Sequence, residues 1–166
     1  SIRDNYLRLI HKAKKSIYIQ PPYFIPDESI QTALLMATMS GVEVNLMFPC
    51  KPDHPFVYWA TLSYVGELIM AGANCYTYDN GFLHAKGLSI DGKACCYGTA
   101  NMDIRSFALN FEVNAMIFDQ NIAGEMERIF REDLKCCTRI TKEMYKSRSV
   151  WIRFKEQISR LLSPVL

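Results

Sequence analysis

The stretch "GFLHAKGLSIDGKACCYGTANMDIRSFALNFE", residues 81–112, places polar side chains at fixed intervals within an alternating apolar frame. Asp91-Gly92 within it is a strong hairpin signal, because the tightest hairpin turn needs residues that tolerate positive φ. The stretch therefore predicts two strands that meet at this turn, and a third strand, "FEVNAMIF", follows over residues 111–118. The polar side chains on these paired strands have two interpretations. They form a solvent-exposed strand face, or they converge on one anionic substrate.

The segments before this hairpin alternate between helix and strand. Hydrophobic periodicity predicts helices over residues 3–15, 28–39 and 56–71, and strands over 16–20, 42–48 and 74–78. Asp27 is placed to cap the second helix, while Gly41 and Gly72 end the second and third. Three prolines make residues 21–27 a loop that forms neither helix nor sheet ladder. The pattern predicts one α/β domain over residues 1–166, with a mixed sheet flanked by helices on both faces.

The chain is expected to be helical from Asn121 to near its end. In "VWIRFKEQISRLL", residues 150–162, Trp151, Phe154, Ile158 and Leu161 recur at helical spacing. This apolar stripe favours packing against the core. The alternative is a helix that lies on a membrane surface.

Composition places limits on the function. The net charge of +2 is too small to indicate nucleic acid or an anionic membrane as a partner from charge alone. The six cysteines include two adjacent pairs and no CxxC spacing, so we expect free thiols in a reducing, cytosolic environment, without disulfides. No acidic cluster or Cys/His spacing matches a metal site. No apolar run is long enough to span a bilayer, so the chain as given is expected to be soluble, with any anchor upstream.

The polar residues of residues 81–112 suit a phosphate group. His84 and Lys86 are two residues apart, so on a strand they share one face, where imidazole acts as nucleophile or acid/base beside a fixed positive charge. Thr99 and Asn101 follow the next strand and offer a hydroxyl and an amide. Glu112, with Asn110 and Asn114 on the same side, could accept the imidazole Nδ1–H and fix its tautomer.

These residues resemble a known signature. His84-x-Lys86-x4-Asp91-x6-Gly98-Thr99-x-Asn101 is similar to the HKD motif of the phospholipase D superfamily, with Thr99 where serine is usual. The resemblance implies a catalytic set of His84, Lys86, Asp91 and Glu112, and phosphate binding by Lys86, Thr99 and Asn101. It implies no cofactor and no metal. Asp91 belongs to the motif, but its place beside Gly92 and its odd offset from His84 indicate a structural role.

The flanking segments "PPYFIPDESIQTAL", "GVEVNLMFP" and "NMDIRSFALNFE" resemble the second catalytic half of bacterial cardiolipin synthases, and the final "RLLSPVL" resembles that family's C-terminus. The resemblance implies transfer of a phosphatidyl group between two phosphatidylglycerol molecules through a phospho-histidine, in an enzyme of the bacterial cell membrane. That family carries two HKD motifs in one chain, and this sequence holds one. The resemblance therefore implies an upstream half of the same enzyme as partner.

Two other interpretations remain open. The chain could be a phosphodiesterase or nuclease of the same superfamily, assembled as a homodimer of single-motif subunits, although the low net charge makes nucleic acid an improbable substrate. It could also be a folded but inactive half. Isolated chains could pair across the HKD face around a two-fold axis.

Overall fold

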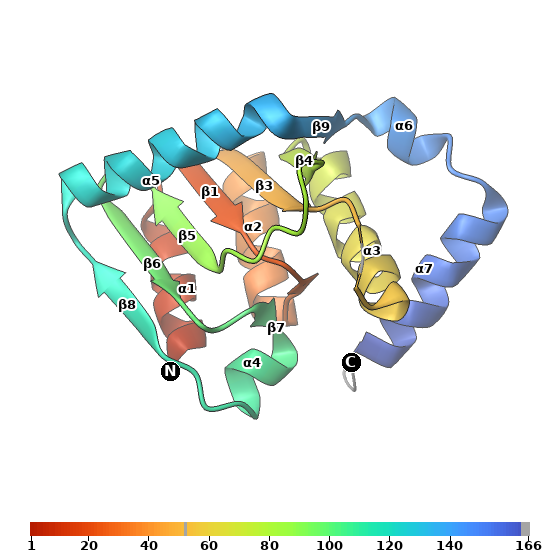
Figure 1. Ribbon diagram of the computed structural model, residues 1–166, viewed down its shortest axis with the longest axis horizontal. Helices are drawn as coiled ribbons and strands as arrows, with labels where there is room; N and C mark the ends of the chain where they lie inside the picture. Colours follow the sequence, from red (N-terminus) through yellow and green to blue (C-terminus); the bar gives the residue numbers. More distant parts are fainter. Residues whose placement is uncertain (52, 164–166) are drawn as a thin grey trace.

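The computed structural model describes residues 1–51 and 53–163 of the chain (Figure 1). The last three residues of "RLLSPVL" therefore lie outside the described residues. The helices are α1 (Ile2–Lys12), α2 (Glu28–Met39), α3 (Pro55–Ala71), α4 (Ile104–Ala108), α5 (Gln120–Asp133), the 3-10 turn η1 (Leu134–Cys136), α6 (Lys142–Lys146) and α7 (Val150–Leu162). The strands are β1 (Ser16–Gln20), β2 (Phe24–Ile25), β3 (Glu43–Pro49), β4 (Asn74–Tyr78), β5 (Gly87–Ile90), β6 (Ala94–Gly98), β7 (Met102–Asp103), β8 (Asn114–Ile117) and β9 (Cys137–Ile140).

Seven of these strands form one mixed sheet in the order β8-β6-β5-β1-β3-β4-β9. The strand pairs β1–β3 and β3–β4 are parallel, because α2 and α3 carry the chain back between them. The other four pairs in this sheet, β1–β5, β5–β6, β6–β8 and β4–β9, are antiparallel. The predicted α/β class with a mixed sheet is confirmed.

Alternate residues of the central strands divide the core into two layers. On one face, Ile17, Ile19 and Leu46 pack with the buried residues of α1, α2 and α3. On the other face, Tyr18 and Met47 pack with Phe130 of α5. Because successive strand residues point to opposite faces, helices cover both sides of the sheet, as Figure 1 shows for α5 against α1 and α2.

Local signals fixed several boundaries as predicted. The Asp27 side chain accepts a hydrogen bond from the Ile30 N–H at 2.9 Å and caps α2. Gly72 ends α3 in the left-handed conformation, with φ of 114°. The hairpin turn between β5 and β6 has positive φ at both Asp91 and Gly92. All six cysteines are free thiols, as expected from their spacing.

Four predicted elements are wrong in part. Residues 21–27 are not purely a loop, because Phe24–Ile25 forms β2 and pairs in parallel with β7. The helix expected from Asn121 onward is interrupted by β9, which closes the sheet edge beside β4. The third strand is shorter than residues 111–118 and begins only at Asn114. Trp151, Phe154, Ile158 and Leu161 of α7 are exposed and do not pack into the core.

Among the described residues, no helix combines the length and the apolar character that crossing a bilayer requires.

Candidate active site

His84 and Lys86 lie in the connection between β4 and β5, one step before the strand begins. The prediction that they share a strand face is therefore wrong in its detail. Their spatial relation is nevertheless close, because the Lys86 ammonium donates a hydrogen bond to the His84 carbonyl oxygen at 3.0 Å. The His84 imidazole is exposed and lies beside the Phe82 ring, with ring centroids 5.7 Å apart. The exposed imidazole is accessible to a phosphate ester, while the Lys86 ammonium is held by the backbone of the same segment.

Lys86 is a partly desolvated positive charge. Burial lowers the pKa of its ammonium below the ordinary value, whereas the nearby carboxylates of Glu112 and Asp103 act in the opposite sense. The Lys86 carbonyl oxygen also accepts the Gly98 N–H at 3.2 Å, which joins this segment to the end of β6. Lys86 thus lies beside the end of β6, where Thr99 and Asn101 follow.

Thr99 and Glu112 are joined directly. The Thr99 hydroxyl donates to one Glu112 carboxylate oxygen in a short hydrogen bond, and Asn110 Nδ2 donates to the other at 3.3 Å. The Val113 N–H donates to Thr99 Oγ1 at 3.0 Å, so the loop before β8 is bonded to the end of β6. The Glu112 carboxylate is hydrogen-bonded to Thr99 and Asn110. That Glu112 also fixes the tautomer of His84 stays a prediction.

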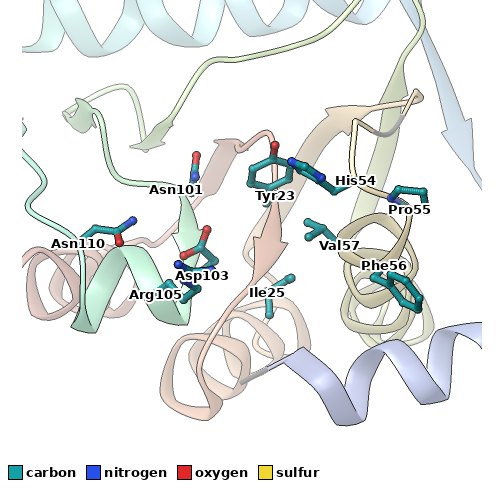
Figure 2. A pocket seen from close by; sticks show the side chains of 10 residues that line it. All are labelled: Tyr23, Ile25, His54, Pro55, Phe56, Val57, Asn101, Asp103, Arg105 and Asn110. Carbon is teal, nitrogen blue, oxygen red and sulfur yellow. The ribbon is translucent and has the colours of Figure 1, made fainter. Parts of the chain in front are cut away.

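Asn101 opens into a cavity of about 450 Å³ (Figure 2). Its Oδ1 atom is buried and has no hydrogen-bond partner among the described residues. Because Oδ1 is an acceptor, the Nδ2 group of Asn101 is the one that could donate to a phosphoryl oxygen. The cavity is lined by Tyr23, Ile25, His54, Pro55, Phe56, Val57, Asn101, Asp103, Arg105 and Asn110. One wall is polar and the other combines the polar Tyr23 and His54 with apolar side chains, so a ligand here would meet both kinds of group.

Sequence reasoning missed the residues that the first half of the chain brings to this cavity. The Tyr23 hydroxyl donates a short hydrogen bond to Asp53, whose other oxygen accepts the His54 N–H at 2.8 Å. Burial, and then the hydrogen bond to Asp53, raise the pKa of Tyr23, so its hydroxyl stays protonated at neutral pH. The only sequence signal for this wall is the proline-rich run at residues 21–26, which by itself indicates a loop and no function.

Asp91 lies apart from this cluster. It is at the far end of β5 from Lys86, where its carboxylate accepts the backbone N–H groups of Lys14, Lys15 and Ser16 at 2.8 to 2.9 Å. Burial opposes ionisation of Asp91, but the three backbone hydrogen bonds outweigh it and lower the pKa of the carboxyl group. These hydrogen bonds give Asp91 a structural contact at the start of β1, in agreement with its place in the hairpin. Its catalytic role stays a prediction.

The structure links Lys86, Glu112 and Thr99 through charge and a hydrogen bond, and it places the exposed imidazole of His84 two residues before Lys86. Of the five predicted site residues, Asn101 lines the cavity. Such groups can bind a phosphodiester and stabilise negative charge that develops at phosphorus. Within the described residues, no group of three or more His, Cys, Asp or Glu side chains is arranged to hold a metal ion.

Residues 6–134 match the family model described as cardiolipin synthase, PLD-like domain. The chain belongs to the phospholipase D-like domain family of cardiolipin synthases. This PLD-like domain is 56% identical over 165 residues to the major cardiolipin synthase ClsA of Bacillus subtilis, and 54% identical over 165 residues to a cardiolipin synthase of Oceanobacillus iheyensis. Each alignment covers 99% of this chain and 34% of the relative. The chain therefore spans about a third of the length of these relatives.

Solved structures show the same fold at low sequence identity. Nuc from Salmonella typhimurium, a phospholipase D family member, superposes with a TM-score of 0.76 at 21% identity, over 85% of this chain and 91% of Nuc. Phosphatidylserine synthase from Haemophilus influenzae has the same TM-score at 16% identity, over 99% of this chain and 42% of the synthase. The PLD-like domain thus corresponds to nearly all of the Nuc chain and to less than half of the phosphatidylserine synthase chain.

Proposed function

We propose that this PLD-like domain supplies one of the two HKD motifs of a phosphatidyltransferase that makes cardiolipin from two phosphatidylglycerol molecules. The observation that supports the proposal is the set of contacts that links Lys86 to Glu112 and Glu112 to Thr99, close in sequence to the exposed imidazole of His84. The choice of lipid substrate is supported by sequence identity of 56% and 54% to two cardiolipin synthases over 99% of this chain.

The first chemical step forms a covalent phosphatidyl-histidine. The imidazole of one motif attacks phosphorus of the first phosphatidylglycerol, so a P–N bond forms and the P–O bond to the terminal glycerol breaks. The other motif's imidazolium gives its proton to the departing glycerol oxygen. His84 takes one of these two roles; the acid/base role fits the second motif of a two-motif chain.

The second step returns the enzyme to its starting state. The now neutral acid/base histidine removes a proton from a hydroxyl of the second phosphatidylglycerol, whose oxygen attacks phosphorus. A new P–O bond forms as the P–N bond breaks, and cardiolipin leaves. In both steps Lys86, Thr99 and Asn101 bind the phosphoryl oxygens, and Glu112 positions His84. Two easier displacements replace one difficult displacement.

The partner is the upstream half of the same enzyme, which packs against the HKD face. Leu109, Phe111 and Val113 flank Glu112 and are 73%, 107% and 71% exposed. Three exposed apolar side chains beside a catalytic carboxylate are suited to burial by a second half that carries its own histidine and lysine. We place the full-length enzyme at the bacterial cell membrane, with this domain on the reducing, cytosolic side.

A comparison of two proteins tests this proposal: the 166-residue chain alone and the chain joined to its upstream half. Both are given phosphatidylglycerol vesicles, and cardiolipin and glycerol are quantified by mass spectrometry. We expect cardiolipin from the joined protein and little or none from the isolated chain, because the mechanism needs two histidines and two lysines. Equal synthesis by both proteins would refute the half-site idea.

The alternative is a single-motif phosphodiesterase formed by two copies of this chain. The extent of the match to Nuc, 91% of that chain, is the observation that favours it. In such a dimer two copies of His84 would meet at one phosphate across the two-fold axis. Hydrolysis of a simple phosphodiester by the isolated chain, together with no cardiolipin from the joined protein, would select this alternative.

A further inference from the structure

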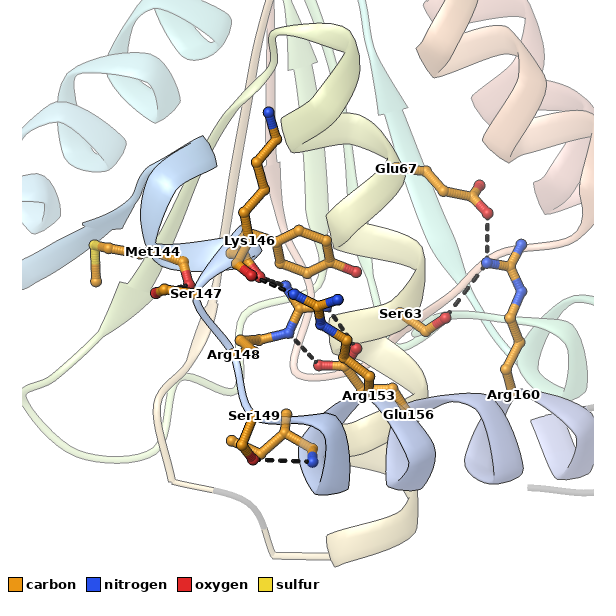
Figure 3. Close-up of polar contacts among 12 residues, drawn as sticks. Ser63, Glu67, Met144, Lys146, Ser147, Arg148, Ser149, Arg153, Glu156 and Arg160 are labelled. Atoms are coloured by element: carbon orange, nitrogen blue, oxygen red, sulfur yellow. Dashed lines mark hydrogen bonds and ion pairs between the residues drawn. The ribbon is translucent and has the colours of Figure 1, made fainter.

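Helix α7 is held to α3 by its polar side chains (Figure 3). Glu156 and Ser159 are each only 1% exposed. The Glu156 carboxylate receives two hydrogen bonds of 2.8 Å from the guanidinium of Arg148, in the turn between α6 and α7. Nearer the end of the helix, Arg160 donates to Ser63 Oγ of α3 at 3.3 Å and pairs with Glu67. This arrangement is the reverse of an ordinary surface helix, which buries its apolar side.

The apolar side of α7 consequently points away from the domain. At 3.6 residues per turn, six of its side chains fall within an arc of about 120° that contains no polar residue. They are Val150, Trp151, Phe154, Ile158, Leu161 and Leu162, with exposed fractions from 38% to 82%. A continuous exposed stripe of this kind marks a binding surface rather than scattered surface hydrophobics.

Positive charge borders this apolar stripe. Arg153 and Lys155 flank it on opposite sides, and both side chains are exposed. Residues 142–162 hold six basic and two acidic residues, a net charge of +4, whereas the whole chain has a net charge of +2. The rest of the chain is therefore net negative. Arg148 and Arg160 are paired with Glu156 and Glu67 on the inward side, so Arg153 and Lys155 are the basic residues that border the stripe. Two copies of this surface would bring like charges together, whereas an anionic lipid surface would meet opposite charge.

An apolar groove connects this surface with the candidate active site. The groove lies between α3 and α7, has a volume of about 230 Å³, and is lined chiefly by Phe56, Trp59, Phe154 and Ile158. Phe56, together with its neighbour Pro55, also lines the cavity that contains Asn101. A lipid whose headgroup occupies that cavity would therefore meet apolar side chains in the direction of α7.

We propose that the apolar face of α7 seats this domain on an anionic phospholipid bilayer, with Arg153 and Lys155 at the headgroups and Trp151, Phe154 and Leu161 among the acyl chains. The proposal deepens the proposed function, on which it rests for the nature of the substrate. The second exposed apolar group, around Phe111, belongs to the segment between α4 and β8, which Figure 1 shows separate from α7.

Vesicle binding by the chain tests this proposal without any turnover. The probes are vesicles of phosphatidylcholine alone, and of phosphatidylcholine mixed with phosphatidylglycerol or with phosphatidylserine. We expect strong binding to both anionic mixtures, weak binding to phosphatidylcholine, and a fall in binding as salt screens the cationic border. In a Trp59→Phe background, Trp151 is the remaining tryptophan, and we expect brominated lipids to quench its fluorescence.

Matched variants identify the surface. Trp151→Ser with Phe154→Ser should weaken binding to anionic vesicles by about tenfold or more, since two buried aromatic contacts are lost. Met36→Ser with Met39→Ser removes two exposed apolar side chains from α2 and should leave binding unchanged. Circular dichroism checks that each variant is folded.

Three results would overturn the proposal. They are unchanged vesicle binding by the Trp151/Phe154 variant, no quenching of Trp151 by brominated lipid, or self-association of the chain through α7 in place of lipid binding. His84→Ala should bind vesicles normally. If the joined, unsubstituted protein bound vesicles but made no cardiolipin, the proposed function would be rejected and this inference retained. If it made cardiolipin but the chain did not bind vesicles through α7, only this inference would be rejected.

Discussion

The Thr99 hydroxyl donates a hydrogen bond to the Glu112 carboxylate, which ties the end of β6 to the loop before β8. The same carboxylate accepts a hydrogen bond from Asn110 and raises the pKa of Lys86 against the effect of burial. Glu112 thus affects two groups proposed to bind phosphate, the Thr99 hydroxyl and the Lys86 ammonium. We therefore expect Glu112 to contribute to substrate binding as well as to the proposed positioning of His84.

We expect His84→Ala to abolish turnover by the assembled enzyme while the domain stays folded. General acid/base catalysis contributes about 10² to 10⁴ in rate, and a residue that takes part in a covalent route can contribute more. The assay is cardiolipin formation from phosphatidylglycerol, with circular dichroism as the test of folding. His11→Ala, at an exposed histidine in the last turn of α1, is the matched control and should retain full activity. Near-normal activity in folded His84→Ala would remove His84 from the mechanism.

Glu112→Gln should lower turnover and change its pH dependence. Burial lowers the pKa of Lys86 and the Glu112 carboxylate raises it, so loss of the carboxylate lets that pKa fall further. The protonated ammonium is then lost at a lower pH, and the alkaline limb of the rate profile should move toward neutrality. Vesicle binding should be preserved.

Thr99→Val separates the hydrogen bond between Thr99 and Glu112 from the electrostatic effect of Glu112 on Lys86. It removes the hydroxyl but leaves the carboxylate, so turnover should fall without the shift of the alkaline limb. If Glu112→Gln left the alkaline limb in place, the electrostatic link to Lys86 would be discarded.

Asp91→Ala should destabilise the domain without altering the chemistry of the site. The carboxylate accepts three backbone N–H groups, and the loss of hydrogen bonds to a charged group costs about 1.5–3 kcal/mol. Its folded pKa is lowered, so its stabilising contribution is complete above the ordinary aspartate range and is lost as pH falls through the folded value. Denaturant unfolding at neutral and acidic pH measures this, and the difference between Asp91→Ala and the natural chain should shrink in acid.

Asp91→Asn is the companion variant, because asparagine tolerates the positive φ but lacks the charge. It should be destabilised less than Asp91→Ala. Loss of activity in either variant at a temperature where it is fully folded would keep Asp91 in the catalytic set.

Chelators should leave turnover by the assembled enzyme unchanged. The proposed steps use histidine for covalent and proton transfer, and Lys86, Thr99 and Asn101 for charge stabilisation, so no step requires an ion. Activity is measured before and after dialysis against EDTA, and again with added Mg²⁺, Ca²⁺ or Zn²⁺. Activity that EDTA removes and a divalent ion restores would contradict the mechanism.

The elements that the sequence predicted well are those decided by local chemistry. Asp27 caps α2, Gly72 ends α3, and Asp91-Gly92 turns the hairpin, because each depends on backbone preferences within a few residues. The α/β class followed from the same local periodicity. The spacing of the HKD motif, with Glu112 downstream of it, is enough to propose His84, Lys86, Thr99, Asn101 and Glu112 as site residues. In the fold, Glu112 contacts Thr99 and acts on the charge of Lys86, whereas Asn101 lines the separate cavity wall beside Asp103.

Features that depend on distant segments could not be predicted in this way. The pairing of Phe24–Ile25 with β7 joins residues almost eighty positions apart, and prolines on either side concealed it. The wall formed by Tyr23 and His54 likewise comes from the other half of the chain. Strand register and the walls of a cavity are set by long-range packing, and the local pattern does not record which segments meet.

Helix α7 shows the division between sequence and tertiary structure most clearly. The sequence by itself determined an amphipathic helix with Trp151, Phe154, Ile158 and Leu161 on one side. Only the tertiary structure decided which side faces the domain. Glu67 and Ser63 of α3, together with Arg148, provide partners for Arg160 and Glu156, and these paired charges hold the polar side inward. Periodicity specifies the two faces of a helix, but the chemistry of the neighbouring surface determines which face is buried.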